Sequence, residues 1–316
     1  MSVRKLPYRP EDHGDHAQPA PDEHGPGPAD DAGEPRALPR DLAPRLARAF
    51  SAPRAGRAAL IPYLTGGHPD TETSERLVAT LIDAGADVVE LGVPFSDPIA
   101  DGPVVQQSTH AALMAGVTPD DVLRLAAAHG ARAPFVLLTY LNSVLAYGPE
   151  RFFARAAGAG VEALVIPDLP LDEAAGRSVS LAREAGGLAA LAAGAGVTLV
   201  PMATPTSTGE RLDLVAAAAT SFVYCVAVTG VTGARAEVGA ELPALLARLR
   251  ERTDAPLAVG FGISTPEQAG SVATLADGVI IGSALIDAVS RAATPDDACA
   301  AARTLVSAAS TAIAGA

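Results

Sequence analysis

Three carboxylates lie close together on one short stretch of this sequence. Glu90, Asp97 and Asp101 fall in the run Glu90-Leu-Gly-Val-Pro-Phe-Ser-Asp-Pro-Ile-Ala-Asp-Gly-Pro103, which contains no Lys or Arg. Glu90 ends an apolar, β-branched run that predicts a buried strand, and the Pro and Gly residues after it predict a rigid loop. Acids without a neutralising partner at the carboxyl end of a strand are suited to proton transfer. The alternative for Asp97 and Asp101 is that they only satisfy turn amides.

The elements that position this loop alternate between strand-like and helix-like runs. The strand-like runs are continuously apolar, which is typical of parallel strands covered on both faces. The expected strands are Ala59–Tyr63, Val88–Leu91, Phe135–Thr139, Ala163–Ile166, Thr198–Pro201, Phe222–Val226, Leu257–Val259 and Val279–Ile281. Eight strand and helix units in a chain of this length predict an α/β fold, a (β/α)₈ TIM barrel, with a doubly wound sheet as the rival.

Many of the expected helices begin at Ser, Thr, Asp or Pro, which are typical of helix starts. They are Asp41–Phe50, Thr73–Ala84, Pro119–His129, Glu150–Ala159, Leu171–Ala185, Gly209–Ala219, Glu241–Arg252, Pro266–Ala273, Ser283–Val289 and Pro295–Ile313. The glycine-rich segment near 186–196 is interpreted as an insertion on the surface. Polar groups and glycines follow each strand directly. In a barrel they would all converge on one mouth, which favours the barrel over the open sheet.

Composition separates residues 1–40 from the rest of the chain. This segment is rich in Pro, Gly, Asp and Glu and has almost no apolar pattern, so we expect a disordered tail followed by one barrel domain over 41–316. The formal net charge of −13 argues against nucleic-acid binding. No stretch predicts a secretory signal or a membrane span, and the two cysteines lack metal-ligand spacing, so we expect a cytoplasmic protein.

Three glycine-bearing turns follow the last expected strands and predict a phosphate site. Glycines allow main-chain N–H groups to approach an anion closely, and loops after strands 7 and 8 of a barrel often bind phosphate. The residues expected to bind the phosphate are Gly233, Gly262, Gly282 and Ser283. The alternative is that these glycines only form tight turns.

Two kinds of carbon–carbon lyase are excluded by residue type. The only lysine is Lys5 in the tail, so a Schiff-base lysine is not available in the expected barrel. His68, His110 and His129 are scattered along it, so we expect no metal site. General acid–base catalysis on a phosphorylated substrate with its own electron sink remains.

Six segments in order carry a resemblance to a known family. They are Ile61-Pro-Tyr-Leu-Thr65, the Glu90–Pro103 run, Val165-Ile-Pro-Asp-Leu-Pro170, Ala203-Thr-Pro-Thr-Ser-Thr208, Val228-Thr-Gly-Val-Thr-Gly-Ala-Arg235 and Val259-Gly-Phe-Gly-Ile-Ser264. Together they closely resemble the tryptophan synthase α chain from about residue 42 to the C-terminus. The resemblance implies a retro-aldol cleavage of indole-3-glycerol phosphate to indole and glyceraldehyde 3-phosphate.

The resemblance also implies a role for individual residues. Glu90 matches the acid–base group, and Asp101 matches the second catalytic carboxylate, which accepts from the indole N–H. Thr232 matches a residue that meets Asp101 when the loop closes. The indole pocket would be lined by Tyr63, Leu138, Tyr224 and Phe261, for which plain core packing is the alternative.

A partner follows from the same resemblance. We expect a β chain that carries pyridoxal phosphate, in an αββα heterotetramer, and no cofactor in this chain itself. The contact face would include Pro94–Pro98 and Asn142–Tyr147, which makes Asp97 an interface or loop acid. The alternatives are a stand-alone lyase that releases indole and a non-catalytic regulatory subunit, and the presence of Glu90 and Asp101 argues against the latter. Another phosphate-binding barrel, such as a sugar-phosphate isomerase, would not need this loop.

Overall fold

The structure is a computed structural model of the chain, and it describes residues 43–51, 57–171, 187–226, 241–260 and 262–316. The expected tail of residues 1–40 lies outside this part of the chain. The expected helix Leu171–Ala185 also lies outside it, except for its first residue.

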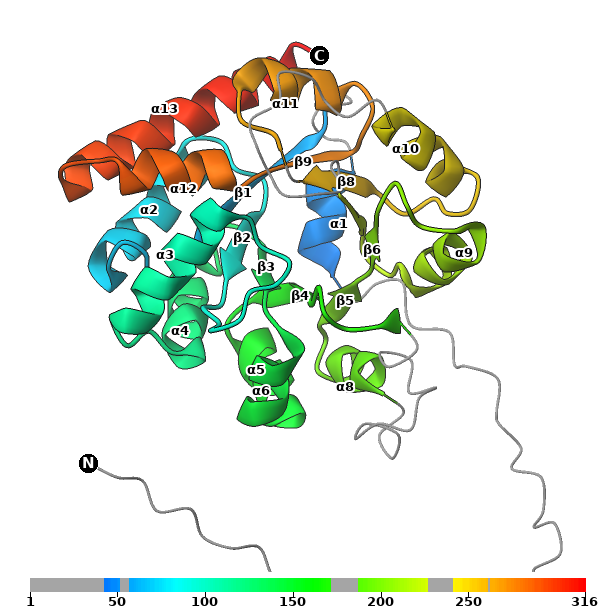
Figure 1. The fold of residues 1–316 in the computed structure, drawn as a ribbon, viewed down its shortest axis with the longest axis horizontal. Coiled ribbons are helices and arrows are strands. Elements are labelled where there is room, and N and C mark those ends of the chain that lie inside the picture. The colour runs from blue at the N-terminus through cyan, green and yellow to red at the C-terminus, as the bar shows by residue number, and fades with distance from the viewer. Residues whose placement is uncertain (1–42, 52–56, 172–186, 227–240, 261) are drawn as a thin grey trace, which may run out of the picture. The chain divides into compact units, whose positions relative to one another are not determined.

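Parallel strands form the centre of the described part (Figure 1). The strands are β1 (Ala59–Thr65), β2 (Val89–Gly92), β3 (Phe135–Leu138), β4 (Val161–Val165), β5 (Thr198–Val200), β6 (Met202–Ala203), β7 (Val223–Val226), β8 (Leu257–Gly260) and β9 (Gly278–Ile281). Their order is β5-β4-β3-β2-β1-β9-β8-β7-β6. All eight expected strands are present, with ends that differ by one or two residues.

The two strands at the ends of this order, β5 and β6, are consecutive in the sequence. β5 pairs with β4 and β6 pairs with β7, and only Pro201 separates β5 from β6. Proline has no N–H to donate to a strand ladder, so the chain changes its partner at this residue. The carbonyl oxygen of Pro201 still accepts from the N–H of Tyr224 at 3.0 Å. β5 and β6 are therefore two halves of one strand, which makes eight strand positions in a ring and confirms the barrel.

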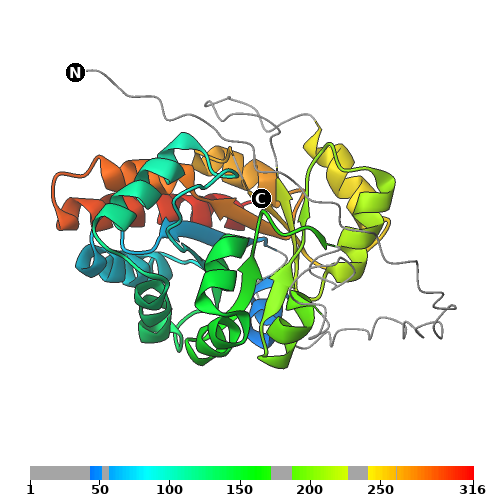
Figure 2. The same cartoon turned by 60° about the horizontal axis from the view of Figure 1, so that its bottom comes forward.

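Helices surround the ring of strands, except for α1, which lies across one end of it (Figures 1 and 2). They are α1 (Pro44–Phe50), α2 (Thr71–Asp83), α3 (Pro103–Met114), α4 (Pro119–His129), α5 (Leu141–Tyr147), α6 (Pro149–Gly158), α8 (Leu188–Gly194), α9 (Gly209–Ala218), α10 (Leu242–Arg250), α11 (Pro266–Ala273), α12 (Ser283–Ser290) and α13 (Pro295–Ala314). The sequence patterns missed α3, α5 and α8. The interpretation of 186–196 as a surface insertion was wrong, because Leu188 and Ala192 of α8 are buried next to α6 and β5.

Helix α1 closes the end of the barrel at which the strands begin. The carboxylate of Glu162, near the start of β4, accepts from the main-chain N–H groups of Arg45 and Leu46 at 3.0 and 2.9 Å. Phe50 at the other end of α1 packs on Phe222, just before β7, with ring centroids 5.2 Å apart. An acid near a helix N-terminus satisfies donors that have no partner within the helix.

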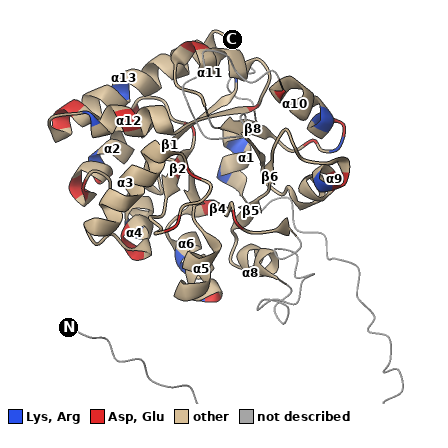
Figure 3. Cartoon of the chain, viewed as in Figure 1, with Lys and Arg blue, Asp and Glu red and all other residues tan. Residues whose placement is uncertain are grey.

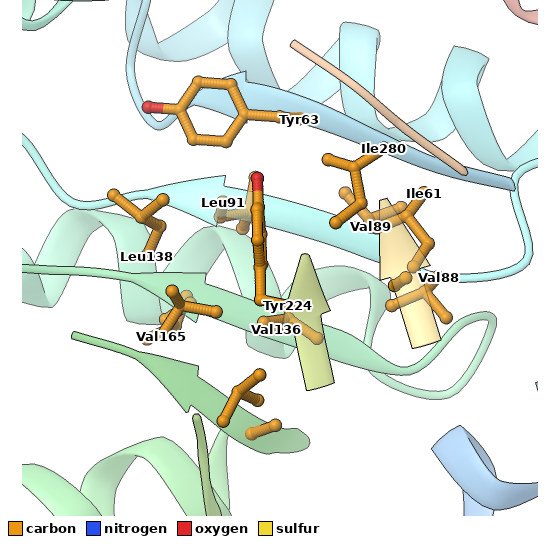
Figure 4. Close-up of a cluster of buried hydrophobic side chains, with 14 of the residues drawn as sticks. Ile61, Tyr63, Val88, Val89, Leu91, Val136, Leu138, Val165, Tyr224 and Ile280 are labelled. Carbon is orange, nitrogen blue, oxygen red and sulfur yellow. The ribbon is translucent and has the colours of Figure 1, made fainter. Parts of the chain in front are cut away.

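Side chains alternate between the inside of the barrel and the helix layer. Residues in register on parallel strands point to the same side, and every second residue of a strand does so as well. Tyr63 is in register with Glu90, and Glu90 with Val136. Figure 4 draws Ile61, Tyr63, Val136, Leu138, Tyr224 and Ile280 together in the barrel interior. Glu90 therefore shares the inner face with these apolar and aromatic side chains.

Charged residues of the described part lie mainly on the surrounding helices and loops (Figure 3). This leaves the barrel interior to apolar side chains and a small number of acids. No helix among the described residues is long and apolar enough to span a membrane.

Candidate active site

Glu90 is a buried acid without a counter-ion in the described part of the chain. It lies in β2 with 1% of its surface exposed. Neither carboxylate oxygen has a hydrogen-bond partner among the described residues. Burial disfavours the charged form, and the nearby Asp101 carboxylate adds repulsion, so the pKa of Glu90 rises from 4.5 to about 8. Glu90 therefore keeps its proton at neutral pH and can act as an acid.

Asp101 approaches the barrel interior from the loop that follows β2. Partial burial raises its pKa from 3.8 to about 6, and a hydrogen bond from Tyr140 opposes this rise. α3 begins two residues later, and Gln106 in its first turns donates to the main-chain oxygen of Asp101 at 2.8 Å. At pH 7 Asp101 is ionised while Glu90 is protonated, so the two acids are in opposite states.

Asp97 is separate from this pair of acids. Its side chain is exposed and accepts from the hydroxyl of Ser96 at 2.5 Å. It does not line the pocket described below. These observations fit a loop or surface acid rather than a catalyst.

Two tyrosines lie over glycines of the neighbouring strands. A methyl group on Gly92 would collide with the Tyr63 hydroxyl, and one on Gly260 would lie 2.6 Å from the Tyr224 hydroxyl. Figure 4 shows the Tyr224 hydroxyl pointing towards the Tyr63 ring. Burial, with the charge of Asp101 as a further cause, raises the pKa of Tyr63 well above its usual value. Both phenols therefore stay protonated and can donate hydrogen bonds.

A pocket opens at the ends of the strands. Its lining includes Asp101, three of the expected indole-binding residues and three of the expected phosphate-binding residues. The lining residues are Tyr63, Asp101, Gly102, Val104, Val105, Leu138, Tyr224, Gly262, Ile263, Ile280, Gly282 and Ser283. Glu90 is not at the pocket surface. It lies directly behind the lining, because it is in register with the lining residue Tyr63 on the neighbouring strand.

The glycine turns lie on one side of this pocket. Gly262 has a φ of +84°, a conformation that residues with a Cβ rarely adopt. Gly282 immediately precedes the first turn of α12, which starts at Ser283. The first N–H groups of a helix lack partners within the helix, and here they begin at the pocket wall.

Three of the expected site residues lie outside the described residues: Thr232, Gly233 and Phe261. Their roles stay predictions. Tyr140 and Ile280 belong to the site region but were given no role by the sequence patterns. The signal for Tyr140 was its position directly after β3, where barrels carry functional side chains. The signal for Ile280 was its spacing of two from Gly282, which places both on the inner face.

No group of three or more His, Cys, Asp and Glu that could hold a metal ion occurs in the part of the chain that is described. His110 of α3 is exposed. His129 is buried at the end of α4, with 8% of its surface exposed.

Comparison with known proteins decides the family. The sequence model described as "Tryptophan synthase alpha chain" matches residues 50–313. The chain belongs to the tryptophan synthase alpha chain family. A tryptophan synthase alpha chain from Carboxydothermus hydrogenoformans is 44% identical over 248 residues, which cover 78% of this chain and 89% of the relative. Another from Gloeobacter violaceus is 46% identical over 253 residues, or 79% of this chain and 88% of the relative.

Solved structures of the family have the same barrel. The tryptophan synthase alpha subunit of Legionella pneumophila superposes with a TM-score of 0.75 at 32% identity, covering 86% of this chain and 99% of its own. A chain of Mycobacterium tuberculosis tryptophan synthase superposes with a TM-score of 0.73 at 35% identity, covering 86% of this chain and 97% of its own.

Proposed function

We propose that this chain cleaves indole-3-glycerol phosphate to indole and glyceraldehyde 3-phosphate. Membership of the family gives it the alpha-subunit role in tryptophan biosynthesis and a lyase activity. The specific reaction is supported by one observation above the others. A buried Glu90 without a partner among the described residues, protonated at neutral pH, lies beside an ionised Asp101 at an apolar pocket.

The two acids divide the proton chemistry between them. Glu90 donates its proton to C3 of the indole ring, which makes the ring an electron sink. The C3–C1′ bond then breaks, its electron pair returns to the ring, and the C1′ hydroxyl loses its proton to Glu90 as the aldehyde forms. Glu90 thus ends the cycle protonated again, and no external oxidant or reductant is needed. Asp101 accepts a hydrogen bond from the ring N–H and stabilises the positive charge that develops there.

The remaining lining residues bind the substrate in this proposal. Tyr63, Leu138 and Tyr224 form the apolar walls for the indole ring, with Phe261 as a further wall. The main-chain N–H groups near Gly262, Gly282 and Ser283 hold the phosphate, together with Gly233. A helix N-terminus favours an anion without the help of a lysine. Thr232 meets Asp101 when the loop closes.

A β chain that carries pyridoxal phosphate is the proposed partner, in an αββα heterotetramer of the cytoplasm. This chain needs no cofactor of its own for the proposed reaction. The loop that carries Asp101 supports a contact at the barrel mouth, because it exposes a large apolar side chain, Ile99, to 80%. The stand-alone lyase and the regulatory subunit are not favoured by the family match.

The test is an assay of indole and glyceraldehyde 3-phosphate from indole-3-glycerol phosphate, for the full chain alone and with a β chain added. We expect both products in equal amounts and a faster reaction when the β chain binds. Absence of both products under both conditions would refute the proposed reaction. High activity without any association with the β chain would favour the stand-alone lyase.

A further inference from the structure

Tyr140 contacts the loop of Asp101 at three points. Its hydroxyl oxygen accepts from the N–H of Ala100 at 3.1 Å. The same hydroxyl makes the side-chain hydrogen bond to the Asp101 carboxylate. Its ring stacks on Phe95, with centroids 4.9 Å apart and planes at 19°. One side chain thus holds the start of the loop, the main chain before the acid, and the acid itself.

The frame of the barrel fixes Tyr140 in turn. Tyr140 is 1% exposed and lies between the end of β3 and the first residue of α5. The N–H of Leu141 donates to the Asp168 carboxylate at 2.8 Å, which holds the main chain directly after Tyr140. Asp168 itself follows β4. The phenol is therefore held by two neighbouring strands, while the loop that it contacts belongs to β2.

We propose that Tyr140 is a positioning residue that orients the Asp101 carboxylate towards the ring nitrogen of the substrate. The inference rests on the proposed reaction, in which Asp101 acts as the hydrogen-bond acceptor. Because the Tyr140 oxygen already accepts from Ala100, its single proton is directed to the carboxylate. A donor aimed at a carboxylate favours the ionised form.

The surroundings of Asp101 make this donor important. Glu90 from β2, Tyr63 from β1 and Tyr224 from β7 face the same region, and Asp168 faces Tyr140 from the β4 side. All of these groups are acids or weak acids, and none supplies a positive charge. Burial disfavours the Asp101 anion, and the Tyr140 hydrogen bond acts against it.

Tyr140→Phe tests the inference because it keeps the ring and removes only the hydroxyl. We expect the acid limb of the kcat/KM profile for indole formation to move to higher pH, since Asp101 then ionises less readily. Above this limb we expect kcat to fall about tenfold, with a smaller change in KM, because the carboxylate is no longer held in line. The matched control is Thr139→Val. It removes a buried hydroxyl one residue away, for which the described residues offer no hydrogen-bond partner.

A cycle with Asp101→Asn separates positioning from general loosening of the fold. If Tyr140 acts through the carboxylate, Tyr140→Phe has little further effect on kcat in the Asp101→Asn background. An undiminished effect there, or a Tyr140→Phe profile that superposes on that of the unaltered chain, would overturn the inference. No indole from the unaltered chain would instead refute the proposed reaction, so the two failures are distinguishable. A thermal unfolding scan of each variant checks that it is folded.

Discussion

Replacing Glu90 with Gln should abolish the lyase reaction and at the same time stabilise the folded chain. The substitution removes a carboxyl that is 1% exposed and has no hydrogen-bond partner among the described residues. Gln has nearly the same shape but does not titrate. Without an acid to protonate the ring carbon, we expect indole formation to fall by about 10²-fold or more.

The gain in stability follows from the pKa of Glu90, which folding raises from 4.5 to about 8. Between these two values the folded chain holds a proton that the unfolded chain has lost. The free energy of unfolding of the unaltered chain therefore decreases as pH rises through this window, by at most about 1.4 kcal/mol for each pH unit. By pH 7 this amounts to about 3 kcal/mol, and above pH 8 the decrease from this group ends. The Glu90→Gln variant has no carboxyl at this position and therefore does not lose this free energy of unfolding as pH rises.

The measurement is urea unfolding at pH 5, 7 and 8.5, for the unaltered chain and the variant. Because the sequence contains no Trp, far-UV circular dichroism is the suitable signal. We expect the free energy of unfolding of the variant to exceed that of the unaltered chain by an amount that grows with pH. At pH 7 we expect its Tm to be about 6–12 °C higher. Asp97→Asn is the control, because it makes the same kind of acid-to-amide change at an exposed position outside the pocket. A difference in free energy of unfolding that is equal at pH 5 and 8.5 would mean that folding does not raise the pKa of Glu90, and one that declines would mean that folding lowers it. Either result would refute Glu90 as an acid that is protonated at neutral pH.

Three further predictions concern the same elements. The pH profile of kcat/KM for indole formation should rise through about 6, as Asp101 ionises, and fall through about 8, as Glu90 loses its proton; a flat profile would contradict the assignment. Gly92→Ala should displace the ring of Tyr63, lower stability by about 1–3 kcal/mol and weaken substrate binding, as measured by unfolding and KM. Asp87→Ala should cost about 3–5 kcal/mol while leaving the rate per folded molecule unchanged, because this carboxylate, 1% exposed, bonds Arg57 far from the pocket.

Much of the barrel could be predicted because each strand is a short apolar run bounded by Gly, Pro or polar residues. The change of strand partner at Pro201 could not be predicted. The run Thr198–Pro201 has the pattern of one strand whether or not its pairing changes midway. α8 was missed because its two glycines, Gly187 and Gly194, look like interruptions. In the fold they lie just before the helix and at its last residue.

The acids Glu90 and Asp101 could be predicted from residue type and spacing, because unpaired carboxylates after a strand are uncommon without a function. Their opposite protonation states could not, because these depend on how deeply each is buried and on a hydrogen bond from Tyr140. A sequence pattern gives the position of Tyr140 after β3. It does not show that the hydroxyl reaches a loop that begins at β2.

The closure of one barrel end by α1 leaves the other end for the site. Glu162 and Phe222 hold this helix against the starts of the strands, and the described pocket lies at the other end, where the strands end. In the proposed reaction, this places the products beside the loop that carries Asp101. A protein seated on that end would therefore cover the pocket and the loop of Asp101 from outside, without a contact to the closed end of the barrel.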